Sequence, residues 1–309
     1  MRTHLLALLL CALCTIGVAT AARAQQTFKS PQDAADTLVA AVRANREDEI
    51  LKVLGRGGRD IVSSGDQVQD EKTKALFLAA YDVRHQVVKR DDKTAELLVG
   101  PDDWPLPIPI VAKNGNWEFD TDGGRREILY RRIGRNELEA IQVSLAYVDA
   151  QADYASMNPE NNPSATYAQR FISSPGKKDG LYWPAAANEQ QSPLGPAFAA
   201  ATLSGYRFTG EPTPFHGYYY KILTAQGPLA PGGAVNYVVD GKMIGGFALV
   251  AYPAEYGKSG VMTFMIGNDG IVYQKDLGEN TDEIVPHITA FNPDQTWKKV
   301  NDSDLTLLR

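Results

Sequence analysis

GRREILYRRIGRNELEAIQVSLAYVDAQADYASM, residues 124–157, is the longest helical pattern of the chain. Its apolar residues recur every three or four positions, the spacing of one face of an α-helix, and they are Ile128, Leu129, Ile133, Leu138, Ile141, Leu145 and Val148. A single glycine, Gly134, interrupts the pattern and costs about 1 kcal/mol relative to alanine, so a kink or break is expected there. We predict a long helix over residues 123–157 that connects two domains.

The same segment concentrates arginine in an acidic protein, at Arg125, Arg126, Arg131, Arg132 and Arg135. On a helix Arg131 and Arg135 are one turn apart, and Arg125 and Arg132 are two turns apart, so the side chains can form a stripe. One interpretation is recognition of an anion or an acidic partner by bidentate guanidinium groups. The other is pairing with Glu127, Glu137, Glu139 and nearby acids between the two domains. The sequence leaves both open.

Residues 25–122, before this helix, are predicted to form an α+β domain. Ser30-Pro31-Gln32-Asp33 is a helix start, with a serine cap, a proline in the first turn and a carboxylate that favours the helix N-terminus. Further helices are expected over residues 46–54 and 68–81. After these helices the apolar residues recur at every second position, which predicts strands over residues 84–89, 94–99, 108–113 and 117–120. Asn114-Gly115 is expected to form a hairpin turn. This arrangement resembles the cystatin-like or nuclear-transport-factor-like (NTF2-like) shape, in which a curved sheet wraps a helix.

After the long helix, residues 158–196 form a loop rich in proline, asparagine and glycine, and residues 197–309 form a β-rich domain. The aromatic residues Phe171, Tyr182 and Trp183 indicate that the loop packs on the rest of the chain. The predicted strands of the last domain are 206–209, 218–224, 234–239, 246–252, 261–266 and 272–276, with turns at Asp240-Gly241 and Asn268-Asp269-Gly270. Its final hairpin resembles that of pilin-like exported proteins, but the long hydrophobic N-terminal helix of a pilin is missing.

The first 24 residues have the pattern of a secretory signal peptide. A basic start is followed by an apolar run from Leu5 to Ala21, and Ala22-Arg23-Ala24 is a signal peptidase site that makes Gln25 the first mature residue. Both cysteines of the chain, Cys11 and Cys14, are removed with it, so the mature protein is neither a thiol oxidoreductase nor a cysteine-ligated zinc protein. We expect export to the periplasm, and no later segment is apolar enough to span a membrane.

The charge balance excludes a further class of function. Without the signal the chain has 29 basic and 37 acidic residues, a net charge of −8, whereas nucleic-acid binding needs a basic face. We therefore predict no nucleic-acid partner, and a length of about 285 mature residues favours two domains.

Several motifs extend a resemblance over almost the whole mature chain. They are Arg131 to Leu138, Tyr147 to Gln151, Phe215 to Tyr219, Leu223 to Gly227 and Gly245 to Tyr256. These segments are similar to an exported bacterial family, the domain of unknown function 2950 (DUF2950). The resemblance implies export to the periplasm but no activity, and it identifies no catalytic residue.

Motifs that would point to a cofactor or metal fail on their spacing. Gly257-Lys258-Ser259 resembles the end of a P-loop, but Tyr252 stands where the loop needs its first glycine. Glu118, Asp120 and Asp122 alternate but lack the later ligands of an EF-hand, so we expect Asp122 to cap the next helix. The mature histidines, His85, His216 and His287, lie in no metal-binding pattern. No cofactor and no metal site is predicted.

His216 is the most informative of the three histidines, because it opens an aromatic strand. His216, Tyr218 and Tyr220, with Trp183, are candidates for a ligand pocket, and a half-buried strand is the alternative. The favoured function is a non-enzymatic periplasmic module that binds an unknown protein partner or small ligand, or is associated with the envelope. The alternatives are a hydrolase that uses carboxylates such as Asp179, Glu255 and Asp276, and a pilin-like structural subunit.

Overall fold

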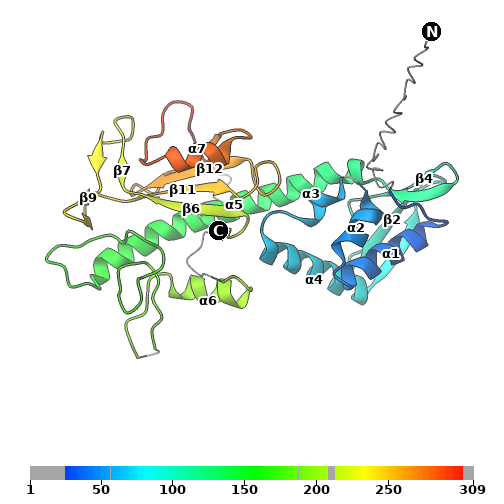
Figure 1. Cartoon of the computed structure of the whole chain (residues 1–309), viewed down its shortest axis with the longest axis horizontal. Coiled ribbons are helices and arrows are strands. Elements are labelled where there is room, and N and C mark those ends of the chain that lie inside the picture. Colours follow the sequence, from blue (N-terminus) through cyan, green and yellow to red (C-terminus); the bar gives the residue numbers. More distant parts are fainter. Residues whose placement is uncertain (1–24, 56, 187, 208–212, 302–309) are drawn as a thin grey trace, which may run out of the picture.

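The computed structural model describes residues 25–55, 57–186, 188–207 and 213–301. Within them, two separate hydrophobic cores lie along one long helix, α5 (Thr121–Met157), and the chain is mixed α+β as predicted. In Figure 1 the N-terminal domain lies at one end of α5 and the C-terminal domain packs along its other half. No helix in the described part of the chain is both long and apolar enough to cross a membrane.

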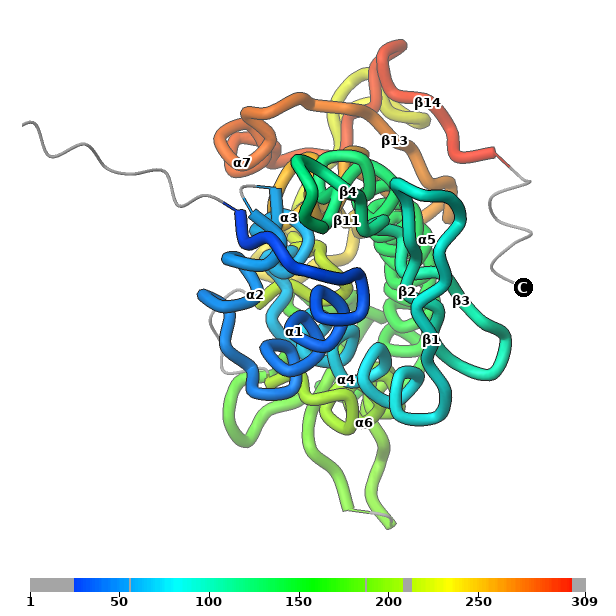
Figure 2. Tube along the Cα trace, turned by 90° about the vertical axis from the view of Figure 1, so that its right-hand side faces the viewer, coloured from blue at the N-terminus to red at the C-terminus, as the bar shows by residue number. Residues whose placement is uncertain are grey.

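The N-terminal domain packs helices against one antiparallel sheet. Its helices are α1 (Pro31–Arg43), α2 (Glu47–Leu54), α3 (Gly58–Val62) and α4 (Gln67–Val83). Its strands follow the order β1-β2-β4-β5, and β3 pairs with β2; they are β1 (His85–Lys89), β2 (Thr94–Val99), β3 (Trp104–Pro105), β4 (Ile110–Lys113) and β5 (Asn116–Phe119). Seen along the long axis, α1, α2 and α4 lie on one side and the strands on the other (Figure 2). Leu38, Ile50 and Leu97 are in the core between them.

Local signals set the ends of these elements as the sequence indicated. The Ser30 side chain accepts a hydrogen bond from the Asp33 backbone and starts α1. Asn114 and Gly115 both have positive φ, 51° and 78°, which is the twist that a two-residue hairpin between β4 and β5 needs. The three predicted helices and four predicted strands are therefore confirmed, whereas the short α3 and β3 were not predicted.

Helix α5 runs from Thr121 to Met157 and continues through Gly134, so the expected break is absent. The expectation that Asp122 caps it is wrong, because the carboxylate of Asp120 accepts the hydrogen bond of the Gly123 backbone. Ile128 packs on the N-terminal core, while Ala140, Ile141, Tyr147, Ala150 and Tyr154 belong to the C-terminal core. The helix is thus a shared wall of both cores rather than a linker between them.

The C-terminal domain is built on a five-stranded antiparallel sheet in the order β14-β13-β12-β11-β6. Its strands are β6 (Tyr218–Leu223), β11 (Ala248–Pro253), β12 (Met262–Gly267), β13 (Val272–Asp276) and β14 (Lys298–Lys299). Two small hairpins lie beside it: β7 (Ala225–Gln226) pairs with β8 (Val235–Asn236), and β9 (Val238–Val239) with β10 (Lys242–Met243). The central strands are almost wholly buried, because α5 covers the sheet.

Two predicted strands of this domain differ in the structure. The pattern over residues 234–239 is divided between β8 and β9, because Tyr237 turns into the core and its backbone pairs with Thr224 and the 244–245 segment. Tyr206 and Arg207 are not in a strand, and residues 208 and 209 lie outside the described part. The remaining elements, α6 (Gly195–Leu203), α7 (Thr281–Ile284) and a 3-10 turn (Val285–His287), were not predicted.

Residues 158–194 form the predicted long loop, and it packs closely on the C-terminal core. Asn158 ends α5 in the left-handed conformation, and its side chain holds the backbone of Asn162. Leu181 and Trp183 are buried in the C-terminal core, and Phe171 and Tyr167 pack against it. The aromatic residues therefore attach the loop to the domain, as the sequence indicated.

Candidate functional site

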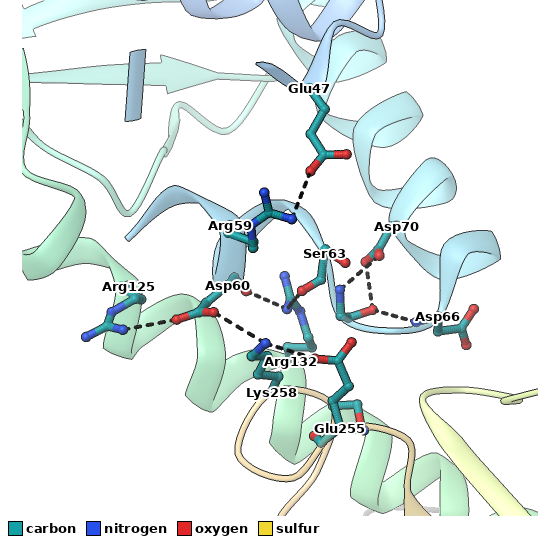
Figure 3. Close-up of polar contacts among 12 residues, drawn as sticks. Glu47, Arg59, Asp60, Ser63, Asp66, Asp70, Arg125, Arg132, Glu255 and Lys258 are labelled. Carbon is teal, nitrogen blue, oxygen red and sulfur yellow. Dashed lines mark hydrogen bonds and ion pairs between the residues drawn. The ribbon is translucent and has the colours of Figure 1, made fainter. Parts of the chain in front are cut away.

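The two domains meet around the first half of α5, where a network of charged side chains joins them (Figure 3). The N-terminal domain contributes α3 and the segment that leads into α4. The C-terminal domain contributes the backbone before β6 and the loop between β11 and β12. The residues of this junction come from four distant parts of the sequence, so only the fold brings them together.

Arg132 is the most buried cationic side chain of the junction, with 9% of its surface exposed. Its guanidinium group donates hydrogen bonds to the backbone carbonyls of Asp60 and Ile61 at the end of α3, the first at 2.8 Å. Burial lowers the pKa of Arg132, and the negative charge of Asp70 opposes that shift. Arg132 thus satisfies carbonyl groups that a short helix leaves without partners.

Asp60 links three parts of the chain. Its carboxylate lies 3.1 Å from Nη1 of Arg125 on α5 and 3.6 Å from Nζ of Lys258 in the C-terminal domain. Lys258 in turn lies 2.9 Å from the carboxylate of Glu255. The hydrogen bond to Glu255 raises the pKa of Lys258, so the ammonium group stays charged at neutral pH.

Asp66 is a second link between the domains, and its side chain is buried. One carboxylate oxygen accepts the backbone N–H of Gln69 and caps α4, at 3.0 Å. The other accepts the Tyr206 hydroxyl at 2.8 Å and the Gly217 backbone N–H at 2.9 Å. Burial, followed by the charge of Asp66, raises the pKa of Tyr206, so that hydroxyl keeps its proton and acts as the donor. Nearby, burial raises the pKa of Asp70 against two hydrogen bonds from Ser64.

The residues proposed for an aromatic pocket are distributed over different environments. His216 lies at the junction, with Nδ1 2.6 Å from the carboxylate of Glu139 on α5. Tyr218 is wholly buried in the C-terminal core and donates to the Met262 carbonyl, while Tyr220 donates to the Phe215 carbonyl. Trp183 packs on Tyr154 near the other end of α5 and donates to Gln190. The structure therefore brings His216 to the junction but uses Tyr218 and Trp183 for packing.

A cleft of about 570 Å³ opens beside the charged network. Its lining includes Asp60 and both Arg125 and Leu129 of α5, residues 253–258 after β11, and Glu279, Thr281 and Asp282 around α7. Two cationic and four carboxylate side chains face it, together with Tyr256. Nε of Arg125 is buried and has no hydrogen-bond partner within the described part of the chain. The cleft can therefore offer both positive and negative groups to a ligand.

The five predicted arginines fall into two groups. Arg125 and Arg132 point into the junction, but their partners are the Asp60 carboxylate and backbone carbonyls rather than Glu127, Glu137 or Glu139. Arg131 is exposed, pairs with Glu127 at 2.7 Å and lies over the ring of Trp104. Arg126 and Arg135 are exposed, and the described residues contain no ion pair for either. The anion-binding interpretation therefore stays open for the exposed group.

The carboxylates named for a hydrolase have separate partners. Glu255 lines the cleft and holds Lys258, whereas Asp276 accepts the Tyr256 hydroxyl at 3.0 Å. Asp179 lies in the long loop, where it accepts hydrogen bonds from the backbone and hydroxyl of Ser174. Burial tends to raise the pKa of Asp179, but these hydrogen bonds outweigh it and the pKa is lowered.

The weaker motifs also have structural roles. Lys258 of the P-loop-like segment forms the ion pairs described above, and Glu118 pairs with Lys113. His85 stacks on Tyr81, and His287 is exposed in the 3-10 turn. Within the described ranges, no group of three or more His, Cys, Asp or Glu side chains could hold a metal ion.

Sequence reasoning missed Asp66, which is the residue that ties α4 to the C-terminal domain. Its signal was present, since an aspartate followed three residues later by Gln69 is typical of a helix N-terminus. The cleft itself had no signal in the sequence, because its walls are up to 222 residues apart, from Asp60 to Asp282.

Comparison with known proteins identifies a family. No curated protein and no solved structure matches the chain, so the cystatin-like, nuclear-transport-factor-like and pilin-like resemblances stay predictions. The model of the family described as "Protein of unknown function (DUF2950)" matches residues 25–300, which is nearly all of the described chain. The chain belongs to the DUF2950 family.

Proposed function

We propose that this protein is exported to the periplasm and acts there as a non-enzymatic binding protein, with the junction cleft as its small-molecule site. The observation that carries the proposal is the cleft of about 570 Å³, which is walled by both domains and by α5. Pockets of this size at domain junctions are the usual place for small ligands. A ligand there would contact both domains at once and strengthen their association.

The lining indicates a small, polar ligand with charged groups. Arg125 and Lys258 stand on the wall that α5 and the 253–258 loop share, and Glu279 and Asp282 stand on the α7 wall. Leu129 and Tyr256 supply apolar surface between them. Because Arg125 and Lys258 are already held by Asp60, they are oriented before any ligand arrives, which lowers the entropy cost of binding.

Export is supported by the N-terminal sequence and by the way the mature chain starts. Residues 1–24 have the composition of a cleaved signal. The side chain of Gln25 donates to the carbonyls of Val53 and Phe119, at 3.1 and 2.7 Å. The fold therefore makes use of the first residue of the predicted mature protein.

The cleft is tested by native mass spectrometry of the exported protein, purified without denaturant. We expect a bound mass that disappears on unfolding, and we expect the substitution Leu129→Trp, which fills the cleft, to remove it. Gln142→Trp adds the same side chain at an exposed position of α5 and should keep the bound mass. A bare wild-type protein that also gains no thermal stability from a periplasmic small-molecule extract would contradict the proposal.

Export is tested separately by the intact mass of protein released from the periplasm of a Gram-negative host. The expected mass corresponds to a chain that begins at Gln25. A full-length mass in the cytoplasmic or membrane fraction would show that export by a cleaved signal is wrong, without affecting the cleft.

A further inference from the structure

The solvent side of α5, opposite the cleft, carries an unusual combination of exposed groups. Arg126, Tyr130, Arg131, Gly134 and Arg135 are all exposed there, and Trp104 of β3 lies beside them against the Arg131 guanidinium group. We name these six residues the arginine face. It contains three guanidinium groups, in a mature chain whose net charge is negative, and the neighbouring carboxylate of Glu127 pairs with Arg131.

Both aromatic side chains of the arginine face are open to solvent. Tyr130 is 68% exposed and Trp104 is 60% exposed, far more than the aromatic residues of either core. The centre of the Arg131 guanidinium group lies 5.2 Å from the centre of the Trp104 ring, which orients the cation over an aromatic surface. These rings therefore contribute little to folding and are available for contact with a ligand.

Gly134 lies one helical turn after Tyr130 and Arg131 on the surface of α5. It follows Tyr130 by four residues and Arg131 by three, so all three share one face of the helix. A Cβ atom at Gly134 would meet no other atom within 4 Å, so packing does not require glycine there. Because glycine in the middle of a helix destabilises it, a reason outside the fold is needed. The missing side chain leaves a flat floor on which a ligand can approach the helix backbone.

We infer that the arginine face binds an anionic saccharide chain. Sugar rings present flat C–H surfaces that pack on exposed aromatic rings, and their carboxylates or phosphates accept paired hydrogen bonds from guanidinium groups. Arg126 and Arg135 are nine residues apart, about 13.5 Å along the helix axis and about half a turn around it, so they lie on the two flanks of the arginine face and several linked sugars can cross the face between them. This inference does not depend on the cleft, which lies on the other side of α5.

The geometry favours a saccharide over a peptide. The backbone groups of α5 are bonded within the helix and β3 has only two residues, so the face offers no long strand edge to which a peptide strand could be added. The two aromatic residues stand apart on a charged surface rather than lining an apolar groove, which a partner helix would need. Guanidinium groups and separate aromatic rings suit a flat, charged and hydroxylated chain.

The test measures binding of a galacturonic acid hexamer to the mature protein by isothermal titration calorimetry. We expect binding that weakens with salt and falls at least tenfold in the double variant Arg126→Gln, Arg135→Gln. The double variant Lys72→Gln, Lys177→Gln removes the same charge from exposed lysines elsewhere and should bind like the wild type. Gly134→Leu should keep or raise the melting temperature while lowering the affinity at least tenfold, a combination that a purely structural role would not produce.

Three results would overturn the inference. The first is failure of the wild-type protein to bind the hexamer at low salt. The second is equal binding of a neutral maltohexaose, which would remove the role of the guanidinium groups. The third is equal binding of a polyglutamate peptide or single-stranded DNA, which would show charge attraction without recognition of sugar.

Discussion

The junction side and the solvent side of α5 use the same residue types for different purposes. On the junction side, the Arg132 guanidinium group is buried and donates to the carbonyls that end α3. On the solvent side, Arg126 and Arg135 are exposed and make no ion pair with the described residues. The difference shows that residue type alone does not assign a role, because a charge has structural value only where the fold removes it from water and supplies partners.

Two of the three glycines of α5, Gly124 and Gly134, make the same contrast without charge. Gly124 is buried against the backbone of Pro107 and Ile108, whereas Gly134 faces solvent with nothing near it. Glycine is required at the first position for close approach of the chain. At Gly134 glycine lowers the stability of the helix, and packing in the N-terminal and C-terminal cores does not explain why it is there.

The largest expected effect comes from Arg132→Gln, which removes the charged donor of the α3 carbonyls. We expect a loss of about 3 kcal/mol in the free energy of unfolding, because buried hydrogen bonds to a charged group are lost and the carbonyls stay buried. Urea unfolding monitored by circular dichroism measures this change in the free energy of unfolding.

Arg126→Gln is the matched control on the other face of the same helix. It should change the free energy of unfolding by less than about 0.5 kcal/mol, as exposed substitutions usually do. If the two variants unfold at the same urea concentration, the distinction between the two faces is wrong.

Gly124→Ala is expected to destabilise the protein by about 2 kcal/mol, since overpacking of a rigid site typically has that cost. The added methyl group would overlap the Pro107 carbonyl oxygen and lie 2.8 Å from Cα of Ile108, and backbone atoms cannot move aside easily. The melting temperature measured by calorimetry reports the effect. An unchanged melting temperature would mean that the 107–108 backbone does not approach α5 as described.

Gly134→Ala should change stability in the opposite direction, by up to about 1 kcal/mol, because alanine has a higher helix propensity than glycine. The open surroundings of Gly134 leave room for the methyl group. Calorimetry again measures the melting temperature, and the sign of its change relative to the wild type is the decisive result. A lower melting temperature would indicate that α5 bends at Gly134 or packs there on something outside the described residues.

The smallest effect is expected for Arg131→Gln, about 0.5 kcal/mol of destabilisation. The variant loses an exposed ion pair with Glu127 at 2.7 Å and the contact with the Trp104 ring. A double-mutant cycle with Glu127→Gln separates the two contributions and should give a coupling energy that decreases with salt. A coupling that salt does not change would contradict a solvent-exposed pair.

Much of the fold was predictable because its signals are local. The hairpin turn at Asn114-Gly115, the Ser30 cap and the periodic apolar residues of α5 act within a few residues of their own position. The small elements were missed for the same reason, since β14 and α7 have few residues and depend on the sheet and the loops around them. The division of residues 234–239 followed from Tyr237, whose burial is decided by the core and not by its neighbours in sequence.

The candidate sites were predictable in part. A helical periodicity already places Arg125 and Arg132 on one face and Arg126 and Tyr130 on another. It does not say which face meets the second domain. The choice of face depends on segments that are distant in the sequence. They are α3, which precedes α5, and the 253–260 loop and the backbone near Gly217, which follow it.

By itself, the sequence determined the α+β class, the long helix, the principal hairpins, the absence of cysteine after residue 24 and the family resemblance. Each of these depends on backbone preferences and hydrophobic periods that are written in short segments. Only the tertiary structure decided which arginines are structural, where the cleft lies and that α5 is a wall of two cores. Those features depend on burial and on contacts between distant residues, and burial is a property of the folded chain as a whole.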